Sequence, residues 1–141
     1  MSIPSPDPSP TDYRDQLPEA AIHERLGIEI LEATRERVVG RMPVEGNTQP
    51  VGLLHGGASL VLAESLGSIG AALHAYPDAV PVGIEINASH HRSATRGMVT
   101  GTAVPLRIGQ TLSTWQIVVV DDDGRDLCTA RLTCLLRPSG A

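Results

Sequence analysis

The sequence predicts an α+β protein in which a curved antiparallel sheet wraps around one central helix, and two observations lead to this prediction. The stretch from His55 to about Leu73 has the length of a long helix and is apolar on nearly every face, so it must be covered by other parts of the chain. After this stretch, four β-rich segments are separated by Gly or Asp-Gly turn signals. The sheet that they form is large enough to cover the helix.

The segments before the central helix predict an arm, a short helix and a hairpin. Residues 1–16 are rich in Pro and Ser, so we expect a disordered arm there and a single domain over 17–138. The segment PEAAIHERLG predicts a short helix with Pro18 at its start and Gly27 at its end. Two strands are expected near residues 28–33 and 37–44, where charged and apolar residues alternate. The loop EGNTQPVGLL then leads into the central helix.

The four segments after the helix predict strands that end in an antiparallel meander: PVGIEINASHHRSA, GMVTGTAVPLRI, TLSTWQIVVVDDD and RDLCTARLTCLLR. Asp123-Gly124 is the clearest hairpin turn signal. Cys128 and Cys134 lie in the last segment, about 20 Å apart if it is one strand, which is too far for a disulfide. We expect both to be core residues, and the Cys and His spacing predicts no zinc site.

Composition narrows the class of protein. The net charge of -5 argues against a nucleic-acid binder. The apolar runs are interrupted by Gly, Ser or Glu before they reach the roughly 20 residues of a membrane span, so we expect no membrane helix. The first residues lack the basic and apolar regions of a signal peptide, and a cytoplasmic location is expected by default.

Glu64 is the single formal charge between His55 and Ala72. A carboxylate moved out of water is costly unless it is paired or neutralised, so its presence calls for a partner or a function. Burial among apolar side chains should raise its pKa toward that of a general base. Alternatively, Ser68 at i+4 and other donors could keep it ionised as a nucleophile, or an arginine from a strand could hold it in a structural ion pair.

The start of the central helix is a second candidate site. Gly56 and Gly57 lie where amides lack intrahelical acceptors and the helix dipole is positive, which would stabilise an oxyanion. The alternative is that the two glycines only make a tight entry into the helix. Next to them, His55 is typical of a helix cap and Gln49 of a solvated loop residue.

The first strand after the helix ends in basic residues. Counting by two from Val82 predicts one face made of Ile84, Ile86, Ala88, His90 and Arg92. With Arg96 and Arg107, the end of this face could form a phosphate-binding rim, or these side chains could simply be solvated. His90 and His91 should point to opposite faces, so they cannot jointly hold a metal.

Three stretches together resemble a known family: NTQPVGLLHGGASLVLAESLGS, GIEINASHHRSATRG and the final strands are similar to the hotdog-fold acyl-CoA thioesterases of the PaaI-like group. Within that group, the resemblance is to 1,4-dihydroxy-2-naphthoyl-CoA and Arthrobacter-type 4-hydroxybenzoyl-CoA thioesterases, and it covers about Leu17 to Pro138. It implies hydrolysis of acyl-CoA thioesters with aryl or other bulky acyl groups, without a metal or other cofactor. It also implies a homodimer with active sites at the interface, usually assembled into a homotetramer.

The resemblance also implies roles for individual residues. Glu64 matches the catalytic carboxylate, and Gly56 matches the helix-start amide that polarises the thioester carbonyl. Gln49 and His55 match the polar pair that positions the substrate, while Ser68 matches the hydroxyl that holds the water or the carboxylate. Whether Glu64 acts as nucleophile or as general base stays open.

His90 and Arg92 match positions near the coenzyme A arm of the substrate. Because Gly56 and Glu64 are eight residues apart, about 12 Å along one helix, one thioester carbonyl cannot touch both, and we expect them to come from different chains. Two other functions compete with thioester hydrolysis. They are a dehydratase or hydratase of hydroxyacyl thioesters on the same fold, and a non-catalytic acyl-CoA-binding protein.

Overall fold

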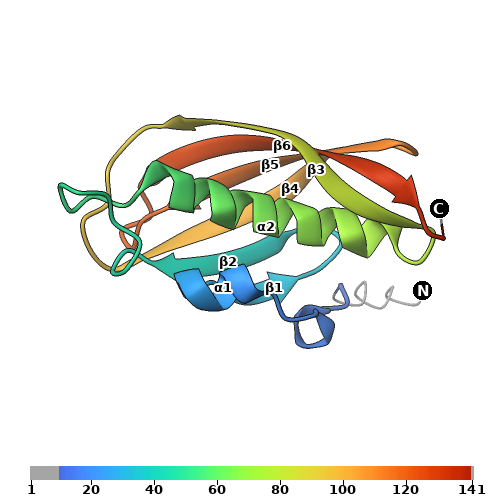
Figure 1. Ribbon diagram of the computed structural model, residues 1–141, viewed down its shortest axis with the longest axis horizontal. Helices are drawn as coiled ribbons and strands as arrows, with labels where there is room; N and C mark the ends of the chain where they lie inside the picture. Colours follow the sequence, from blue (N-terminus) through green and yellow to red (C-terminus); the bar gives the residue numbers. More distant parts are fainter. Residues whose placement is uncertain (1–9, 141) are drawn as a thin grey trace, which may run out of the picture.

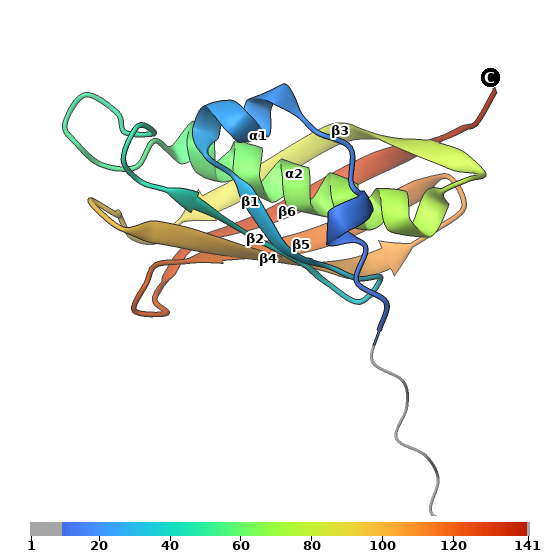
Figure 2. The same cartoon turned by 90° about the horizontal axis from the view of Figure 1, so that it is seen from below.

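A six-stranded antiparallel sheet curves around one long helix in the computed structural model, which describes residues 10–140 (Figure 1). Seen from below, the same helix lies along the concave side of the sheet (Figure 2). The elements in chain order are η1 (Arg14–Gln16), α1 (Ala21–Leu26), β1 (Glu29–Ala33), β2 (Val38–Pro43), α2 (Gly56–Ala75), β3 (Ala79–His90), β4 (Met98–Ile108), β5 (Leu112–Val120) and β6 (Asp126–Pro138). The predicted α+β fold with its central helix is confirmed.

The strand order is β1-β2-β4-β5-β6-β3. As predicted, β1 and β2 form a hairpin, and Asp123-Gly124 lies in the turn between β5 and β6, where Gly124 has a φ of 78°. The last three strands form a meander, but β3 pairs with β6 rather than with β4 and becomes an edge of the sheet. The long connection from β3 to β4 therefore crosses the sheet, which the order of the segments does not reveal.

Helix α2 packs one side against the sheet and leaves the other side open. Leu62 and Leu66 are fully buried between helix and sheet. Gly67 and Gly70 allow a close approach, since a Cβ on Gly70 would lie 2.5 Å from the Trp115 ring and one on Gly67 would lie 2.7 Å from Leu132. The expectation that one chain covers the helix on all sides is wrong. Composition shows that an apolar helix must be covered, but it does not show that its own sheet does all of the covering.

By length and composition alone, α2 could also cross a membrane, because it has 20 residues and few charges. The expectation that interruptions in the apolar runs exclude such a helix therefore does not hold. In this fold, however, α2 packs against strands β2 to β6. Core helices of soluble proteins pass the same test, so the length of α2 is weak evidence for a membrane span.

Strand β3 contains a bulge that changes which residues face α2. Gly83 pairs with Cys134 and Glu85 pairs with Thr133, so Ile84 is an extra residue in the ladder. Ile86, Ala88 and His90 share a face as predicted, but Ile84 does not share it and is 55% exposed. The two-residue alternation used for the prediction fails at this position because a bulge shifts it by one.

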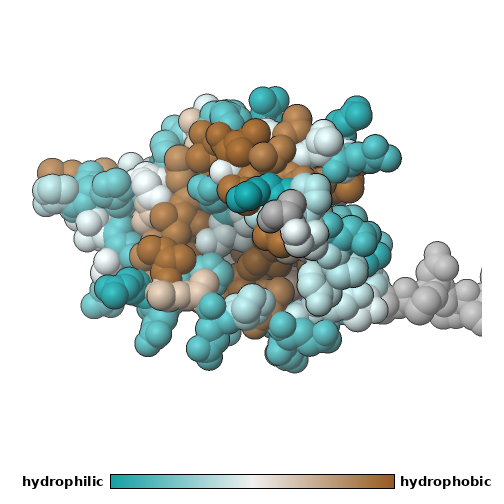
Figure 3. Space-filling model, turned by 45° about the vertical axis from the view of Figure 1, so that its right-hand side comes forward, coloured by the Kyte–Doolittle hydropathy of each residue, from teal (hydrophilic) through white to brown (hydrophobic). Residues whose placement is uncertain are grey.

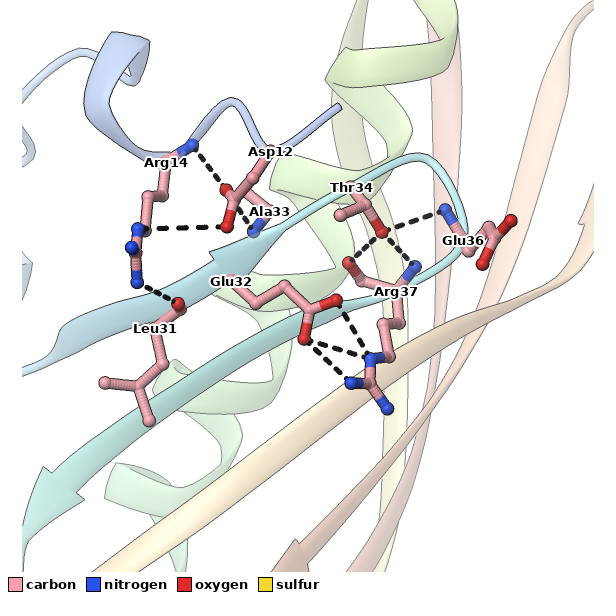
Figure 4. A network of polar contacts seen from close by, with 8 residues as sticks. All are labelled: Asp12, Arg14, Leu31, Glu32, Ala33, Thr34, Glu36 and Arg37. Carbon is pink, nitrogen blue, oxygen red and sulfur yellow. Dashed lines mark hydrogen bonds and ion pairs between the residues drawn. The ribbon is translucent and has the colours of Figure 1, made fainter. Parts of the chain in front are cut away.

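The segment before α1 is anchored to the β1–β2 hairpin (Figure 4). The carboxylate of Asp12 accepts hydrogen bonds from the amides of Arg14 at 2.9 Å and Ala33 at 3.1 Å, and the Tyr13 amide donates to the Ala33 carbonyl. These bonds and the short helix η1 correct the expectation of a disordered arm for residues 12–16. Residues 1–9 of the expected arm lie outside the described residues.

Both cysteines lie in β6 and are fully buried, as predicted. Their thiols are free. Burial raises the pKa of Cys128, so this thiol stays protonated in the core.

Candidate active site

The open side of α2 forms one wall of a groove of about 1260 Å³. Glu64 and Ser68 lie on this wall, and the segment from Leu17 to Glu24, which includes most of α1, forms another. Glu64 is half-buried rather than deeply buried, because the groove gives it access to solvent. Within residues 10–140 its carboxylate forms no ion pair and accepts no hydrogen bond, which removes the alternative of a structural pair with a strand arginine.

Gly83 lies directly against the Glu64 carboxylate. A Cβ at this position would lie 2.5 Å from Glu64 Oε1, so any residue other than glycine would displace the carboxylate from this position. The neighbouring position in β6 is Cys134, whose thiol lies close to Ser68 and Glu64. Burial raises the pKa of Cys134; the Ser68 hydroxyl lowers it and the nearby Glu64 charge raises it again. Glu64 and Ser68 are thus brought together as predicted, above a protonated thiol.

The start of α2 carries the second part of the predicted site. His55 caps the helix: its Nδ1 accepts a hydrogen bond from the Gly57 amide at 2.8 Å. A neutral ring in this arrangement carries its proton on Nε2. The Ala58 amide donates to the His55 carbonyl. Among the described residues, no group accepts a hydrogen bond from the Gly56 amide, which leaves this donor free at the positive end of the helix.

His90 also lies at the helix start. Its Nε2 is 3.0 Å from the place where a Cβ on Gly56 would be, so its ring covers one side of this glycine. His91 points to the other face of the sheet, where its ring contacts the Thr129 hydroxyl at 3.0 Å. The prediction that His90 and His91 face opposite sides is therefore confirmed.

The loop before α2 is held by a residue that sequence reasoning missed. The side-chain amide of Asn47 donates to the carbonyls of Leu26 and Pro43, both at 2.8 Å, and its backbone carbonyl accepts from the His55 amide. Gln49 lies in this loop and accepts from the Val51 amide at 2.6 Å. An Asn beside a glycine in a turn was the available signal for Asn47.

Gly83 was also missed, although a glycine inside a strand is a known sign of a bulge or a close approach. The predicted arginine rim is only partly supported. Arg92 is exposed just after β3, near the start of α2, but Arg107 lies near the far end of β4, about 30 Å along the strand from Met98. Arg96 precedes Met98, so Arg96 and Arg107 cannot contact one ligand group in the same chain.

The site thus holds a free carboxylate on a groove wall and, 12 Å or so along the same helix, a free amide at a positive helix end. Carboxylates serve as nucleophiles and general bases, and free helix-start amides stabilise oxyanions. Both kinds of group take part in attack on a carbonyl carbon.

Comparison with known proteins agrees with this chemistry. Residues 51–128 match the Thioesterase superfamily. The chain is 49% identical to the 1,4-dihydroxy-2-naphthoyl-CoA hydrolase of Escherichia coli over 78% of this chain and 76% of that protein. It is 47% identical to the proofreading thioesterase EntH of Cronobacter sakazakii, over 79% and 77% of the two chains. A thioesterase of Haemophilus influenzae matches the structure with a TM-score of 0.82 at 35% identity, over 85% of each chain. The chain therefore belongs to the thioesterase superfamily, and it is a thioester hydrolase with the hotdog fold.

Proposed function

We propose that this hydrolase cleaves acyl-CoA thioesters that carry aryl or other bulky acyl groups, with Glu64 as its catalytic carboxylate. The observation that carries the proposal is the place of Glu64, which has no ion-pair partner among residues 10–140 and lies on the wall of a groove large enough for such an acyl group. The name of the similar naphthoyl-CoA hydrolase supports an aryl-CoA substrate, and the name of the similar proofreading thioesterase supports a thioester substrate. Coenzyme A is part of the substrate in this proposal and not a cofactor.

Glu64 acts by one of two routes. As a nucleophile, its oxygen attacks the carbonyl carbon, the C–S bond breaks, coenzyme A leaves as a thiolate, and water hydrolyses the mixed anhydride. As a general base, it takes a proton from a water molecule that attacks the same carbon, and the departing thiolate is then protonated. In both routes the carbonyl oxygen gains negative charge, which the Gly56 amide stabilises. Ser68 orients the carboxylate or the water.

The other proposed site residues position the substrate. His55 fixes the first turn of α2 through its bond to the Gly57 amide, and so holds the neighbouring Gly56 amide in place. Gln49 lies in the loop that leads to this turn, near the expected place of the thioester. His90 and Arg92 lie at the same end of the sheet, where they would meet the coenzyme A arm.

We further propose a homodimer in which Glu64 of one chain works with the Gly56 amide of the other. Three features support it. The two groups lie about 12 Å apart on one helix, which is too far for a single carbonyl to touch both. One side of α2 is open, and β3 is an edge strand with a free row of backbone groups. Its side chains Val80 and Val82 are exposed although apolar.

Apolar surface is visible on the side of the molecule that Figure 3 shows, between polar regions. On the face of the sheet away from α2, Val104, Leu112 and Leu135 are also exposed. Such a face would be covered if two dimers packed sheet to sheet, so we propose the homotetramer that the resemblance implies. Its test is the molar mass in solution, with Leu135→Glu expected to yield dimers.

The test of the proposed reaction is Glu64→Gln, followed by thiol release from acyl-CoA with a disulfide dye. The substitution keeps the shape but removes both nucleophilicity and basicity, so turnover should fall by at least about 10³-fold. Glu45→Gln, the same change at an exposed loop position, is the matched control and should retain full activity. Near-normal turnover in Glu64→Gln would overturn the proposed mechanism. Binding of acyl-CoA without any thiol release by the unmodified protein would favour the binding-protein alternative.

A further inference from the structure

The loop that joins β2 to α2 projects beyond the first turn of α2 in both views of the fold (Figures 1 and 2). Its tip is a tight turn, in which the Gly52 amide donates to the Gln49 carbonyl at 3.0 Å and the Gln49 amide donates to the Leu53 carbonyl at 2.8 Å. Pro50 occupies the second position of this turn, where its fixed φ is favourable. The Gln49 side chain also accepts a hydrogen bond from the Val51 amide. These contacts hold the tip of the loop in one shape.

Val51 lies at this tip with 76% of its surface exposed. The apolar residues that follow it, Leu53 and Leu54, are half-buried. None of residues 45–54, all of which the structure describes, lines the groove of its own chain. Burial of so exposed an apolar side chain would be favourable, and the groove of its own chain does not bury it. Val51 is therefore available to a surface outside its own chain.

The symmetry of the proposed dimer determines which surface this is. A two-fold axis parallel to α2 would keep every residue level with its own copy, so Gly56 would stay about 12 Å along the helix from the partner's Glu64. A two-fold axis perpendicular to α2 makes the two helices antiparallel. Placed level with Leu60, midway between the two residues in α2, it brings Gly56 of one chain level with the partner's Glu64. Only this second arrangement builds the two shared sites.

In the antiparallel arrangement, whatever projects beyond the start of one α2 lies beside the partner's α2 on the C-terminal side of Glu64. That stretch of α2 is the wall of the groove, to which it contributes Ser65, Ser68, Ile69 and Ala72. Ala72 lies about 12 Å beyond Glu64 along the helix. The loop tip of each chain therefore lies over the part of the partner's groove that is distant from the thioester.

We propose that Val51 of each chain enters the groove of its partner and contacts the end of the acyl group that lies farthest from the thioester. This inference rests on the proposed function and its shared-site dimer. An apolar contact at this place favours an apolar acyl group. The size of the side chain at position 51 limits the length of that group, because a close-packed site does not accept added volume. A short acyl group ends before it reaches Val51, so its hydrolysis should not depend on this residue.

The experiment uses straight-chain acyl-CoAs from butanoyl- to hexadecanoyl-CoA as rulers and measures kcat/KM for each by thiol release. Val51→Trp should lower kcat/KM for the longest chain that the unmodified enzyme hydrolyses by about tenfold or more, and should change the butanoyl-CoA value by less than about twofold. Val51→Ala should shift the chain-length profile in the opposite direction, toward longer chains. Val51→Thr, which keeps the shape of the side chain, is the matched control and should leave the profile unchanged.

Hybrid dimers show which chain supplies Val51 to a given site. Chains with Glu64→Gln supply only the helix start of the intact site, and chains with Gln49→Ala and His55→Ala supply only its Glu64. Val51→Trp in the Glu64→Gln chains should shift the chain-length profile of the hybrids, whereas the same substitution in the other chains should not. The reverse pattern would show that Val51 acts within its own chain, and it would overturn the inference.

The remaining outcomes separate this inference from the proposed function. Equal loss at every chain length, or an unchanged profile in both Val51→Trp and Val51→Ala, would overturn the role of Val51 and leave hydrolysis by Glu64 intact. The molar mass in solution shows whether Val51→Trp still assembles; if it does not, Val51→Leu provides the same comparison with less added volume. Hybrids without activity would refute the shared sites and this inference with them. Absence of thiol release from every acyl-CoA would instead overturn the proposed function itself.

Discussion

Replacing Gly83 by alanine should lower the activity of this enzyme strongly while changing its thermal stability little. The new Cβ would lie 2.5 Å from Glu64 Oε1, whereas ordinary contacts begin at 3.4 Å, so the carboxylate must move by about 0.9 Å. The other nearby atoms, Glu64 Cδ and Leu132 Cδ1, are both at 3.5 Å and need not move. Glu64 is a flexible, half-buried side chain, and a changed rotamer costs only about 1 kcal/mol.

A displacement of about 1 Å at a catalytic group typically lowers the rate about 100-fold, which corresponds to about 2.7 kcal/mol of lost transition-state stabilisation. We therefore expect kcat of Gly83→Ala to fall about 100-fold while the midpoint of thermal unfolding changes by only a few degrees. Thiol release from benzoyl-CoA measures the first quantity, and circular dichroism during heating measures the second.

Gly70→Ala is the matched comparison, because its Cβ would also meet an atom at 2.5 Å. That atom belongs to the ring of Trp115, which is fully buried and donates its indole N–H to Ser113. A buried ring cannot move aside as a flexible carboxylate can. The free energy of unfolding of Gly70→Ala should therefore be lower by about 1–3 kcal/mol. It should keep most of its kcat below its unfolding temperature. Normal kcat in Gly83→Ala would show that Glu64 does not work from the position beside this glycine.

Three further predictions concern the assembly of the site, the coenzyme A arm and the N-terminal segment. Inactive Glu64→Gln chains are mixed with inactive chains that carry Gln49→Ala and His55→Ala, and the subunits are allowed to exchange. The mixture should regain about a quarter of normal activity, because half the dimers are hybrids and each hybrid has one intact site out of two. Hybrids that form but stay inactive would refute shared sites. Arg92→Ala should raise KM for acyl-CoA more than it lowers kcat, and a pantetheine thioester that lacks the nucleotide should be unaffected, because Arg92 is proposed to bind the phosphates; equal effects on both substrates would rule this out. Asp12→Asn should speed trypsin cleavage of the segment before α1. Hydrogen bonds from the Arg14 and Ala33 amides lower the pKa of Asp12 in the folded state. The stabilisation that the Asp12 carboxylate gives to this segment is therefore complete above the pKa that Asp12 has in the unfolded chain. It is lost as the pH falls through the lower pKa of the folded state. Hydrogen exchange of the Tyr13 amide should therefore speed up, relative to the unfolded chain, only in acid; equal protection of that amide in Asp12→Asn would contradict the anchoring role.

Most of the secondary structure could be predicted because it follows from local patterns. The spacing of apolar residues predicts the length of α2, and the Asp-Gly pair predicts the turn between β5 and β6. The place of β3 beside β6 could not be predicted in the same way, because pairing depends on residues about 50 positions apart, such as Gly83 and Cys134. The bulge at Ile84 has the same origin, since it is defined by the partner strand as much as by β3 itself.

In the candidate site, too, the features that follow from local sequence could be predicted and those that depend on distant residues could not. The residue types at Glu64, Gly56 and His55 suggested their chemistry, and the structure places them on one helix with the expected cap. The open side of α2 was not predicted, because a helix sequence shows that it must be covered but not by which chain.

The bulge in β3 also determines how this strand could tolerate a change in length. Gly83 and His90 are seven positions apart, so in an unbroken strand they would face opposite sides; the extra residue lets both face α2. Deleting Ile84 would close the ladder into regular pairing and keep both orientations. Deleting Asn87, only three positions further along, would either keep the bulge and turn His90 away from Gly56, or close the bulge and turn Glu85 instead of Ile86 toward α2. Homologues that vary in length here should therefore lose or gain a residue at position 84, and length changes elsewhere in β3 should coincide with altered activity.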